Sequence, residues 1–275
     1  YYNYLNDALL LPSKINTLNP FKAYNRYLIN KEKLKWLKKI TVLLTGYSDP
    51  EALNKAEEIN PNLKASKFGW GLDLDYWYAV IDKETARRKL KIPAEAFVIL
   101  LSQRLIPKYQ VDRFIEVIAQ IKPAKPLVCY ITGFGLPDYK SYLQGLVERF
   151  GLNNKICFVG YVSDEELRNY MIASDLFVTV PTVFAGSTGA IKEMAIGRPV
   201  FTVNSGSTYY FLKEQNAGIF VSPTDYEEWR HKLESIINGE IIVKTVKREI
   251  VTNYYSWKKT AEQTKKAIDL LFEEN

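Results

Sequence analysis

The sequence predicts an α/β protein built on a doubly wound, Rossmann-like parallel sheet. From residue 96 onward, short apolar runs alternate with segments whose apolar residues recur at helical spacing. Strands that are apolar on both faces and alternate with helices are typical of a parallel sheet covered on both sides. Right-handed crossovers between such strands then give a doubly wound sheet.

The elements of this sheet can be followed in order along the chain. The expected strands lie at residues 97–102, 126–132, 155–160, 176–181, 198–203 and 217–222. The expected helices read VDRFIEVIAQI, DYKSYLQGLVERF, DEELRNYMIA, GAIKEMAI and DYEEWRHKLESII. Cys129 and Cys157 each lie inside an apolar run, so we expect two buried thiols, no disulfide and a cytoplasmic protein. No apolar run approaches the ~20 residues that span a bilayer.

The first 72 residues indicate only part of a second domain. They hold a helix near 21–39, a strand at 41–45, a helix in PEALNKAEEI and a strand around LKASKFGW. A complete domain of the same type needs about 100 residues or more. We therefore expect an incomplete Rossmann-like domain with a linker over residues 1–72, a complete sheet domain over 73–250, and an amphipathic helical segment over 251–275.

The basic charge of the chain is concentrated in its first quarter. Residues 1–72 carry 11 Lys/Arg and 6 Asp/Glu, whereas residues 73–275 carry 26 and 25. The helix near 21–39 is amphipathic with interspersed lysines, which suits peripheral contact with an anionic membrane or, as the favoured interpretation, packing on its own domain. The nearly neutral sheet domain argues against nucleic-acid binding. His231 is the single histidine, so we expect neither a metal site nor a histidine-based triad.

The segments that follow the expected strands carry the candidate ligand-binding residues, because ligands of an open parallel sheet bind beyond the carboxyl ends of its strands. Arg104 and Lys108 follow one strand, and the glycine turns GFG and AGSTG follow two others. Glycines let a main chain approach a ligand closely, and free N–H groups at a helix start attract anions. Together with two cations they suit a diphosphate. Glu193, in the helix after AGSTG, is placed to accept hydrogen bonds from the vicinal hydroxyls of a ribose.

Six blocks occur in a characteristic order: R-L-x-P-K, TGFGLP, FVGYVSDEEL, ASDLFVTVP, a glycine turn leading to KEMAIGRPV, and AGIFV-x-P. In order and spacing they resemble the carboxyl-terminal domain of the retaining glycosyltransferases of the GT-B fold, within the group 1 class, or family 4. The resemblance spans roughly residues 40–260. The family commonly carries F-S-W near its end, and YYSWKKTAEQ is similar to that element.

This resemblance implies a nucleotide-diphospho-sugar held in a cleft between two Rossmann-like domains. The sugar would pass, with retention at its anomeric carbon, to a hydroxyl acceptor such as a glycan, lipid or polysaccharide precursor. Arg104 and Lys108 would neutralise the leaving diphosphate, so neither a metal nor another cofactor is expected. Glu193 matches the second glutamate of the family's E-x7-E motif, which implies a ribose contact. The final helix would cross back toward the N-terminal domain.

Further contacts with the nucleotide sugar are implied by the same resemblance. Segments that usually contact the base and the ribose hold Gly133, Phe134, Gly135, Tyr161 and Val162. The glycine turn, which would meet the diphosphate or the sugar, holds Gly186, Ser187, Thr188 and Gly189.

The sequence departs from the family pattern where the sugar and the phosphates are held. Ala185 stands where the first glutamate of E-x7-E belongs, and Tyr109 stands where the family has its lysine, one place after Lys108. Gln110 replaces the glycine that follows this lysine, and Tyr210 stands where a glutamate is common. The residues that match the family on the nucleoside side, such as Glu193, therefore predict nucleotide recognition. The departures concern the residues that would take part in transfer of the sugar.

Two alternatives to a glycosyltransferase remain open. One is a glycosyltransferase-like module that binds a nucleotide sugar, or supports a partner enzyme, without catalysis, as Ala185 and Tyr109 suggest. The other is a nucleotide-sugar epimerase of related fold, which matches the blocks less well. Residues 1–72 resemble only the last portion of the family's N-terminal domain. We therefore expect this chain to be part of a longer polypeptide rather than one that a partner completes.

Overall fold

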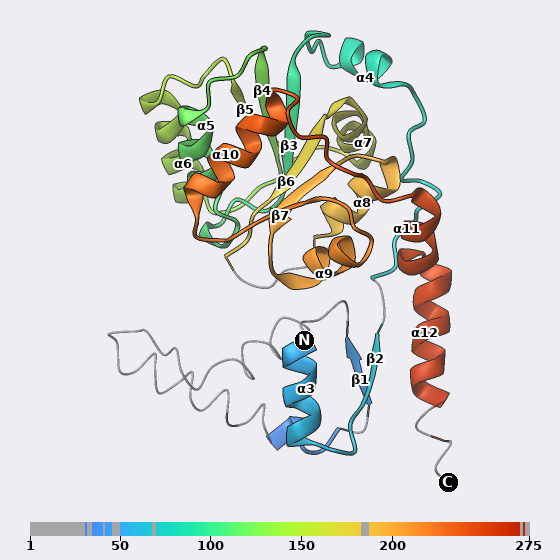
Figure 1. The fold of residues 1–275 in the computed structure, drawn as a ribbon. Coiled ribbons are helices and arrows are strands. Elements are labelled where there is room, and N and C mark those ends of the chain that lie inside the picture. The colour runs from blue at the N-terminus through green and yellow to red at the C-terminus, as the bar shows by residue number, and fades with distance from the viewer. Residues whose placement is uncertain are drawn as a thin grey trace. The chain divides into compact units, whose positions relative to one another are not determined.

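The computed structural model of the protein describes residues 31, 35–40, 42–45, 50–67, 70–182, 187–269 and 272. The chain divides into two compact units, one formed by Asp73–Asn253 and the other by Tyr1–Leu72 with Tyr254–Asn275. The unit Asp73–Asn253 contains the large sheet (Figure 1) and every described residue of the predicted site.

Six parallel strands form this sheet in the order β5-β4-β3-β6-β7-β8. Their bounds are β3 Phe97–Ser102, β4 Leu127–Thr132, β5 Ile156–Gly160, β6 Leu176–Thr179, β7 Val200–Val203 and β8 Ile219–Val221. Each strand falls within one of the six predicted runs. The predicted doubly wound parallel sheet is therefore confirmed.

Helices cover both faces of the sheet (Figure 1). On one face pack α5 (Val111–Gln120), α6 (Pro137–Arg149) and α10 (Tyr226–Ile237). On the other pack α4 (Lys83–Lys89), α7 (Asp164–Ala173) and α8 (Thr188–Ile196), while α9 (Gly206–Glu214) lies against β7. Helices that return along both faces leave the carboxyl ends of the strands free to hold loops and ligands.

A hydrophobic core fills the space between the first of these faces and its helices. Phe114 from α5, Leu143 from α6 and Trp229 from α10 are fully buried there, together with Ile99 and Leu101 of β3. Burial of a side chain of this size stabilises the fold by about 1.5–3 kcal/mol relative to its exposure. This core fixes α5 and α10 against the sheet.

Two helices of the structure are absent from the sequence prediction. The helix α4 precedes the first strand of the predicted sheet domain, and Asp82 caps it by accepting a hydrogen bond from the Thr85 N–H. The helix α9 begins at Gly206, in a stretch rich in serine, threonine and tyrosine that favours helix only weakly. Its Phe211 and Leu212 are buried, so tertiary packing outweighs its weak helical propensity.

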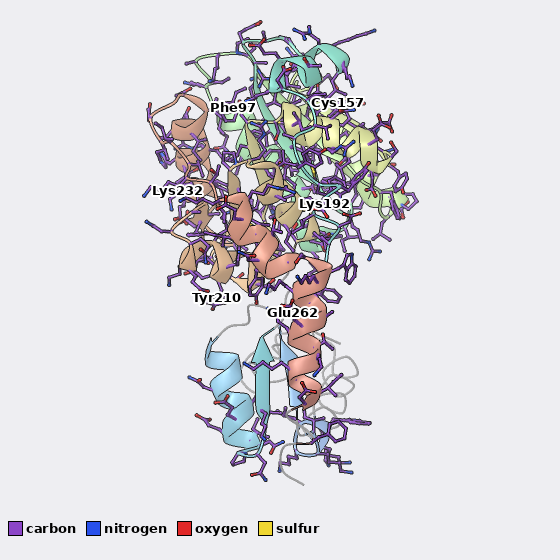
Figure 2. All side chains as sticks on the ribbon, turned by 90° about the vertical axis from the view of Figure 1, so that its right-hand side faces the viewer. Phe97, Cys157, Lys192, Tyr210, Lys232 and Glu262 are labelled. Carbon is purple, nitrogen blue, oxygen red and sulfur yellow. The ribbon has the colours of Figure 1, made fainter. Side chains whose placement is uncertain are left out.

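The prediction that both cysteines are buried is wrong for Cys157. Cys129 is buried on β4, but Cys157, labelled in Figure 2, is exposed. The reason is that β5 forms one edge of the sheet, where only Ile156 is buried. An apolar run does not reveal whether its strand lies at the centre or at the edge.

The second unit contains a two-stranded parallel sheet and helical segments among its described residues. The strands are β1 (Val42–Thr45) and β2 (Lys64–Lys67), joined through α3 (Pro50–Ile59). The helix α12 (Trp257–Asp269) contacts both strands. Of the predicted basic helix near 21–39, residues 31 and 35–39 are described, and residues 31 and 35–37 are helical. The other residues of this prediction lie outside the described part of the chain. No helix in the described part of the chain is long and apolar enough to cross a membrane.

The predicted C-terminal helix is divided in two at Ser256. The helix α11 (Arg248–Tyr255) precedes this residue and α12 follows it. Ser256 pairs with Leu72, whose N–H donates to the Tyr255 carbonyl at 2.9 Å.

Two cations hold the segment at residues 74–77, at the start of the unit Asp73–Asn253. Arg248 of α11 donates hydrogen bonds to the carbonyls of Leu74, Trp77 and Ala195. The Lys192 ammonium of α8, labelled in Figure 2, lies 3.7 Å from the centre of the Trp77 ring. The segment is therefore anchored to the helix that carries Glu193.

Candidate functional site

The candidate site lies at the carboxyl edge of the large sheet, where the strand order reverses. From β3 the chain goes to β4 and β5 on one side, and then to β6, β7 and β8 on the other. The reversal places the loops after β3 and β6 at a switch point, which is where doubly wound sheets bind ligands. The predicted site residues follow four neighbouring strands, β5, β4, β3 and β6.

The loops after β3 and β4 are paired through their main chains. The Leu105 N–H donates to the Phe134 carbonyl, and the Leu136 N–H donates to the Leu105 carbonyl. A Cβ at Gly135 would lie 2.0 Å from the Leu105 oxygen, and one at Gly133, whose φ is 116°, would lie 2.2 Å from the Gln103 oxygen. Both glycines are required because two main chains touch. Their identity as glycine therefore carries no information about a ligand.

Two exposed aromatic rings stand next to these loops. Phe134 is 62% exposed and Tyr161 is 78% exposed, and their ring centres are 6.0 Å apart in an edge-to-face arrangement. The Gly133 N–H donates to the Gly160 carbonyl and joins the two segments. Val162 beside Tyr161 is half-buried. Two aromatic side chains kept in solvent offer the kind of surface on which a planar base stacks.

The two predicted cations lie on the loop after β3. Arg104 is exposed and Lys108 is half-buried, and neither side chain has a partner among the described residues. Lys108 sits in a short 3-10 turn, η1 (Pro107–Tyr109), and its carbonyl accepts a hydrogen bond from the Thr182 N–H at 2.8 Å. This bond ties the turn to the loop after β6, so Lys108 lies at the switch point. Tyr109 is partly buried and packs against the hydrophobic core.

The first turn of α8 completes the edge. Ser187 caps this helix by accepting from the Ala190 N–H, and its own N–H donates to the Thr208 hydroxyl. Thr188 is exposed, whereas Gly189 is buried, and a Cβ there would lie 3.2 Å from the Ser102 carbonyl oxygen at the end of β3. The helix start thus lies directly beside β3. Gly186 and Ala185 fall outside the described residues.

Glu193 is a buried carboxyl without a hydrogen-bond partner. Its side chain is 0% exposed, and neither oxygen has a partner among the described residues. Burial raises the pKa of the Glu193 carboxyl well above its ordinary value, and the charge of Arg198 offsets part of this rise. A buried polar group normally finds a partner. An unpartnered carboxyl near a candidate ligand site is therefore a candidate acceptor for ligand hydroxyls.

Sequence reasoning missed two side chains that organise this edge. The hydroxyl of Thr208, which accepts from Ser187, comes from the unpredicted helix α9. Gln110 was noted only as a replacement for glycine, yet its side chain bonds to segments after β6 and β8. Tyr210, the position where a glutamate is common, lies next to Tyr209 on α9, with ring centres 4.9 Å apart.

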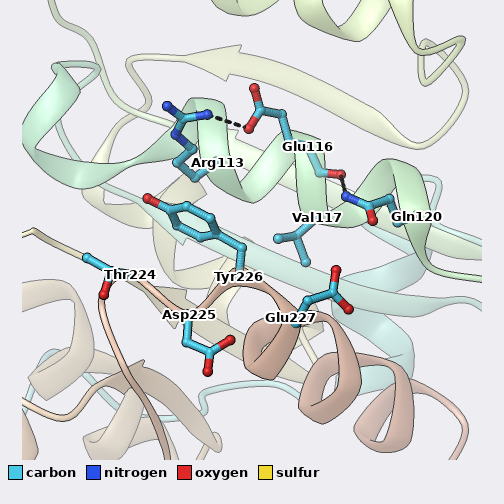
Figure 3. Close-up of a pocket in the computed structure, with 8 residues that line it drawn as sticks. All are labelled: Arg113, Glu116, Val117, Gln120, Thr224, Asp225, Tyr226 and Glu227. Atoms are coloured by element: carbon cyan, nitrogen blue, oxygen red, sulfur yellow. Dashed lines mark hydrogen bonds and ion pairs between the residues drawn. The ribbon is translucent and has the colours of Figure 1, made fainter.

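A cavity of about 610 Å³ lies elsewhere, between α5 and α10 (Figure 3). Arg113 and Glu116 of α5 form an ion pair of 2.7 Å at its wall, and Tyr226 of α10 lies across from them. None of the predicted site residues lines it. The switch point, which gathers the cations and the glycine turn, is therefore the candidate site.

The sequence matches the family described as glycosyl transferases group 1 over residues 82–269. The chain belongs to this family. The match includes every predicted site residue, and the predicted family is confirmed.

Curated relatives agree with this assignment at low identity. A glycosyltransferase of Methanocaldococcus jannaschii is 24% identical over 200 residues, which cover 71% of this chain and 50% of the relative. A D-inositol 3-phosphate glycosyltransferase of a Nocardioides species is 27% identical over 201 residues, covering 66% and 43%. The chain thus spans about half the length of the curated relatives that it matches.

Solved structures confirm the fold. Sucrose-phosphate synthase from Thermosynechococcus elongatus superposes with a TM-score of 0.75 at 19% identity, covering 100% of this chain and 67% of the other. The Anabaena protein HepE, solved with UDP and glucose, gives a TM-score of 0.70 at 18% identity, covering 88% and 67%. The predicted GT-B type of fold is thereby confirmed.

Proposed function

We propose that the carboxyl edge of the six-stranded sheet binds a nucleotide-diphospho-sugar, and that the protein transfers its sugar to a hydroxyl acceptor. The observation that carries this proposal is the convergence at the switch point, within a group 1 glycosyl transferase, of a helix start and two cations that have no partner among the described residues. The unpartnered Glu193 lies on the same helix. The solved complexes of HepE with UDP and with UDP-glucose make UDP the first nucleotide to test.

The order of the loops suggests how such a ligand would lie. Phe134 and Tyr161, after β4 and β5, would stack on the base, and Glu193 would accept hydrogen bonds from the ribose hydroxyls. Arg104, Lys108 and the N–H groups of Thr188 and Gly189 would then meet the diphosphate, because cations and free helix N–H groups both attract phosphate oxygens.

In the proposed reaction the bond between the anomeric carbon and the diphosphate oxygen breaks. A bond from the acceptor oxygen to the same carbon forms, and the hydroxyl proton of the acceptor passes to the leaving diphosphate. Negative charge grows on the leaving diphosphate, and Arg104 and Lys108 would stabilise that charge, as fixed cations do at developing oxyanions. We propose a reaction without metal on this basis, and we propose retention of configuration from the resemblance to the retaining glycosyltransferases. The unit Asp73–Asn253 would hold the donor.

A binding module without catalysis is the second candidate. The observation in its favour is Tyr109, which stands in the family's lysine position and packs against the core rather than serving as a cation. Both candidates require nucleotide binding. Only the first predicts transfer of labelled sugar from UDP-glucose, or from another nucleotide sugar, to an acceptor.

Calorimetric titration of the chain with UDP, GDP and ADP tests the binding step common to both. We expect one of these nucleotides to bind, and Glu193→Ala to weaken its binding by about 1–3 kcal/mol, because the ribose hydroxyls would lose their buried hydrogen-bond partner. Absence of binding by all three nucleotides would contradict the proposal. Unchanged affinity in Glu193→Ala would remove the ribose contact from it.

A further inference from the structure

Gln110 occupies a backbone conformation that normally calls for glycine. It is the residue between η1 and α5, with φ 51° and ψ 36°, in the left-handed region. Residues with a Cβ rarely adopt this conformation because the Cβ crowds the carbonyl oxygen. The turn therefore needs a compensating interaction to keep Gln110 in place.

The side chain of Gln110 supplies three such interactions. It is only 4% exposed, and its amide nitrogen donates to the carbonyl of Val180 at 3.0 Å and to that of Pro223 at 3.1 Å. Its amide oxygen accepts a hydrogen bond from the Tyr226 hydroxyl at 3.2 Å. Both amide hydrogens and the oxygen are thus used, and in a buried setting each of these bonds is costly to lose.

These bonds join segments that follow three different strands. Gln110 follows β3, Val180 directly follows β6, and Pro223 follows β8. The turn η1 is also held from the β6 side, where the Thr182 N–H donates to the Lys108 carbonyl at 2.8 Å. The turn that carries Lys108 is therefore bonded, across the switch point, to segments that follow β6 and β8.

We infer that Gln110 is a positioning residue, which holds η1 so that Lys108 meets the diphosphate of the donor. This inference rests on the proposed function. Tyr109 stands in the family's lysine position and packs on the core. The cation of this turn is therefore Lys108, one position earlier than in the family pattern. The three hydrogen bonds of the Gln110 side chain fix η1 in the conformation that presents Lys108.

The test compares UDP with uridine, which lacks the diphosphate. In Gln110→Gly the backbone conformation is relaxed and only the three side-chain bonds are lost. We expect UDP affinity, measured by calorimetry, to fall about tenfold, as when one charge-assisted contact loosens. Uridine binding, followed by ligand-observed NMR, should stay unchanged. In the background of Lys108→Ala, Gln110→Gly should cause no further loss of UDP affinity.

Two tyrosine variants form a matched pair. Tyr226→Phe removes the hydroxyl that donates to Gln110, so it should lower UDP affinity in the same sense but to a smaller degree. Tyr139→Phe removes a hydroxyl that donates to Asp112 of α5 at 2.8 Å, and it should leave UDP affinity unchanged. Melting temperatures of all variants verify that each one is folded.

Three outcomes would overturn the inference. The first is unchanged UDP affinity in a folded Gln110→Gly variant. The second is an equal loss of UDP and uridine binding, which would show a general structural role. The third is a full additional loss in the double variant with Lys108→Ala. If the wild-type chain binds no nucleotide, the proposed function itself fails, and this result is distinct because it appears before any substitution.

Discussion

At the scale of single residues, Glu193 is a side chain whose buried setting in the free protein is unfavourable to the fold. It is fully buried on α8 without a partner, and its carboxyl is ready to accept hydrogen bonds from a ligand. Sites that bind ligands commonly retain groups that cost stability in the free state. Glu193 therefore links the stability of the chain to its proposed ligand.

The pH dependence of stability should reveal this cost. Burial raises the pKa of the Glu193 carboxyl from its ordinary value of 4.5. The contribution of Glu193 to the free energy of unfolding is therefore fully present below pH 4.5 and is lost as the pH rises through the folded-state pKa. Glu193→Gln does not titrate. The melting temperature of Glu193→Gln should therefore rise relative to that of the wild type as the pH is raised from about pH 4 to pH 8.

Glu228 on α10 provides a control of opposite sign. Its hydrogen bond from Lys232 lowers the pKa of the Glu228 carboxyl, so its stabilisation is present above pH 4.5 and is lost as the pH falls through the lowered pKa. The melting temperature of Glu228→Gln should therefore fall relative to that of the wild type as the pH rises. If the melting temperatures of the wild type and of Glu193→Gln changed in the same way with pH, this result would contradict the assignment of Glu193 as a buried carboxyl without a partner among the described residues.

At the scale of elements, the loops after β3 and β4 continue the pairing of their strands. Gly133 and Gly135 allow this continuation because their Cβ positions are occupied by carbonyl oxygens of the neighbouring loop. The rigid edge that results carries Arg104 on one loop and Phe134 on the other. Pairing of the loops, rather than contact with a ligand, explains these glycines.

Alanine substitutions test this explanation. Gly135→Ala would place a methyl group 2.0 Å from the Leu105 oxygen, and we expect it to destabilise the chain by more than about 2 kcal/mol. Gly145→Ala is the matched control, because a Cβ there meets nothing in the middle of α6. It should stabilise by about 0.5–1 kcal/mol. Urea unfolding measures both, and equal effects of the two substitutions would be evidence against the paired loops.

The elements also show how far sequence reasoning reaches. Strands and helices of the sheet were predictable because apolar periodicity directly reports two-sided burial, as in β3. Strand order was not, so the exposure of Cys157 on the edge strand was missed. The helix α9 was missed because only its packing against β7 makes a serine- and tyrosine-rich segment helical. The side-chain bonds of Gln110 join segments that are distant in sequence, which periodicity does not report.

At the scale of the whole molecule, the chain comprises one complete sheet unit and a second unit with two described strands. The sheet unit brings the loops after four neighbouring strands to a single edge. Membership of the group 1 glycosyl transferases gives this edge its proposed ligand, and the cytoplasmic location expected from the cysteines stays a prediction. The central claim is that a nucleoside diphosphate binds at this edge.

Hydrogen–deuterium exchange of the chain with and without saturating UDP tests this claim most directly. We predict that UDP slows exchange in the loops at residues 103–110, 133–136 and 160–163 and in the first turns of α8, because a bound ligand shields and orders these main-chain amides. Exchange that is unchanged in these segments, or slowed only around the cavity between α5 and α10, would contradict the account.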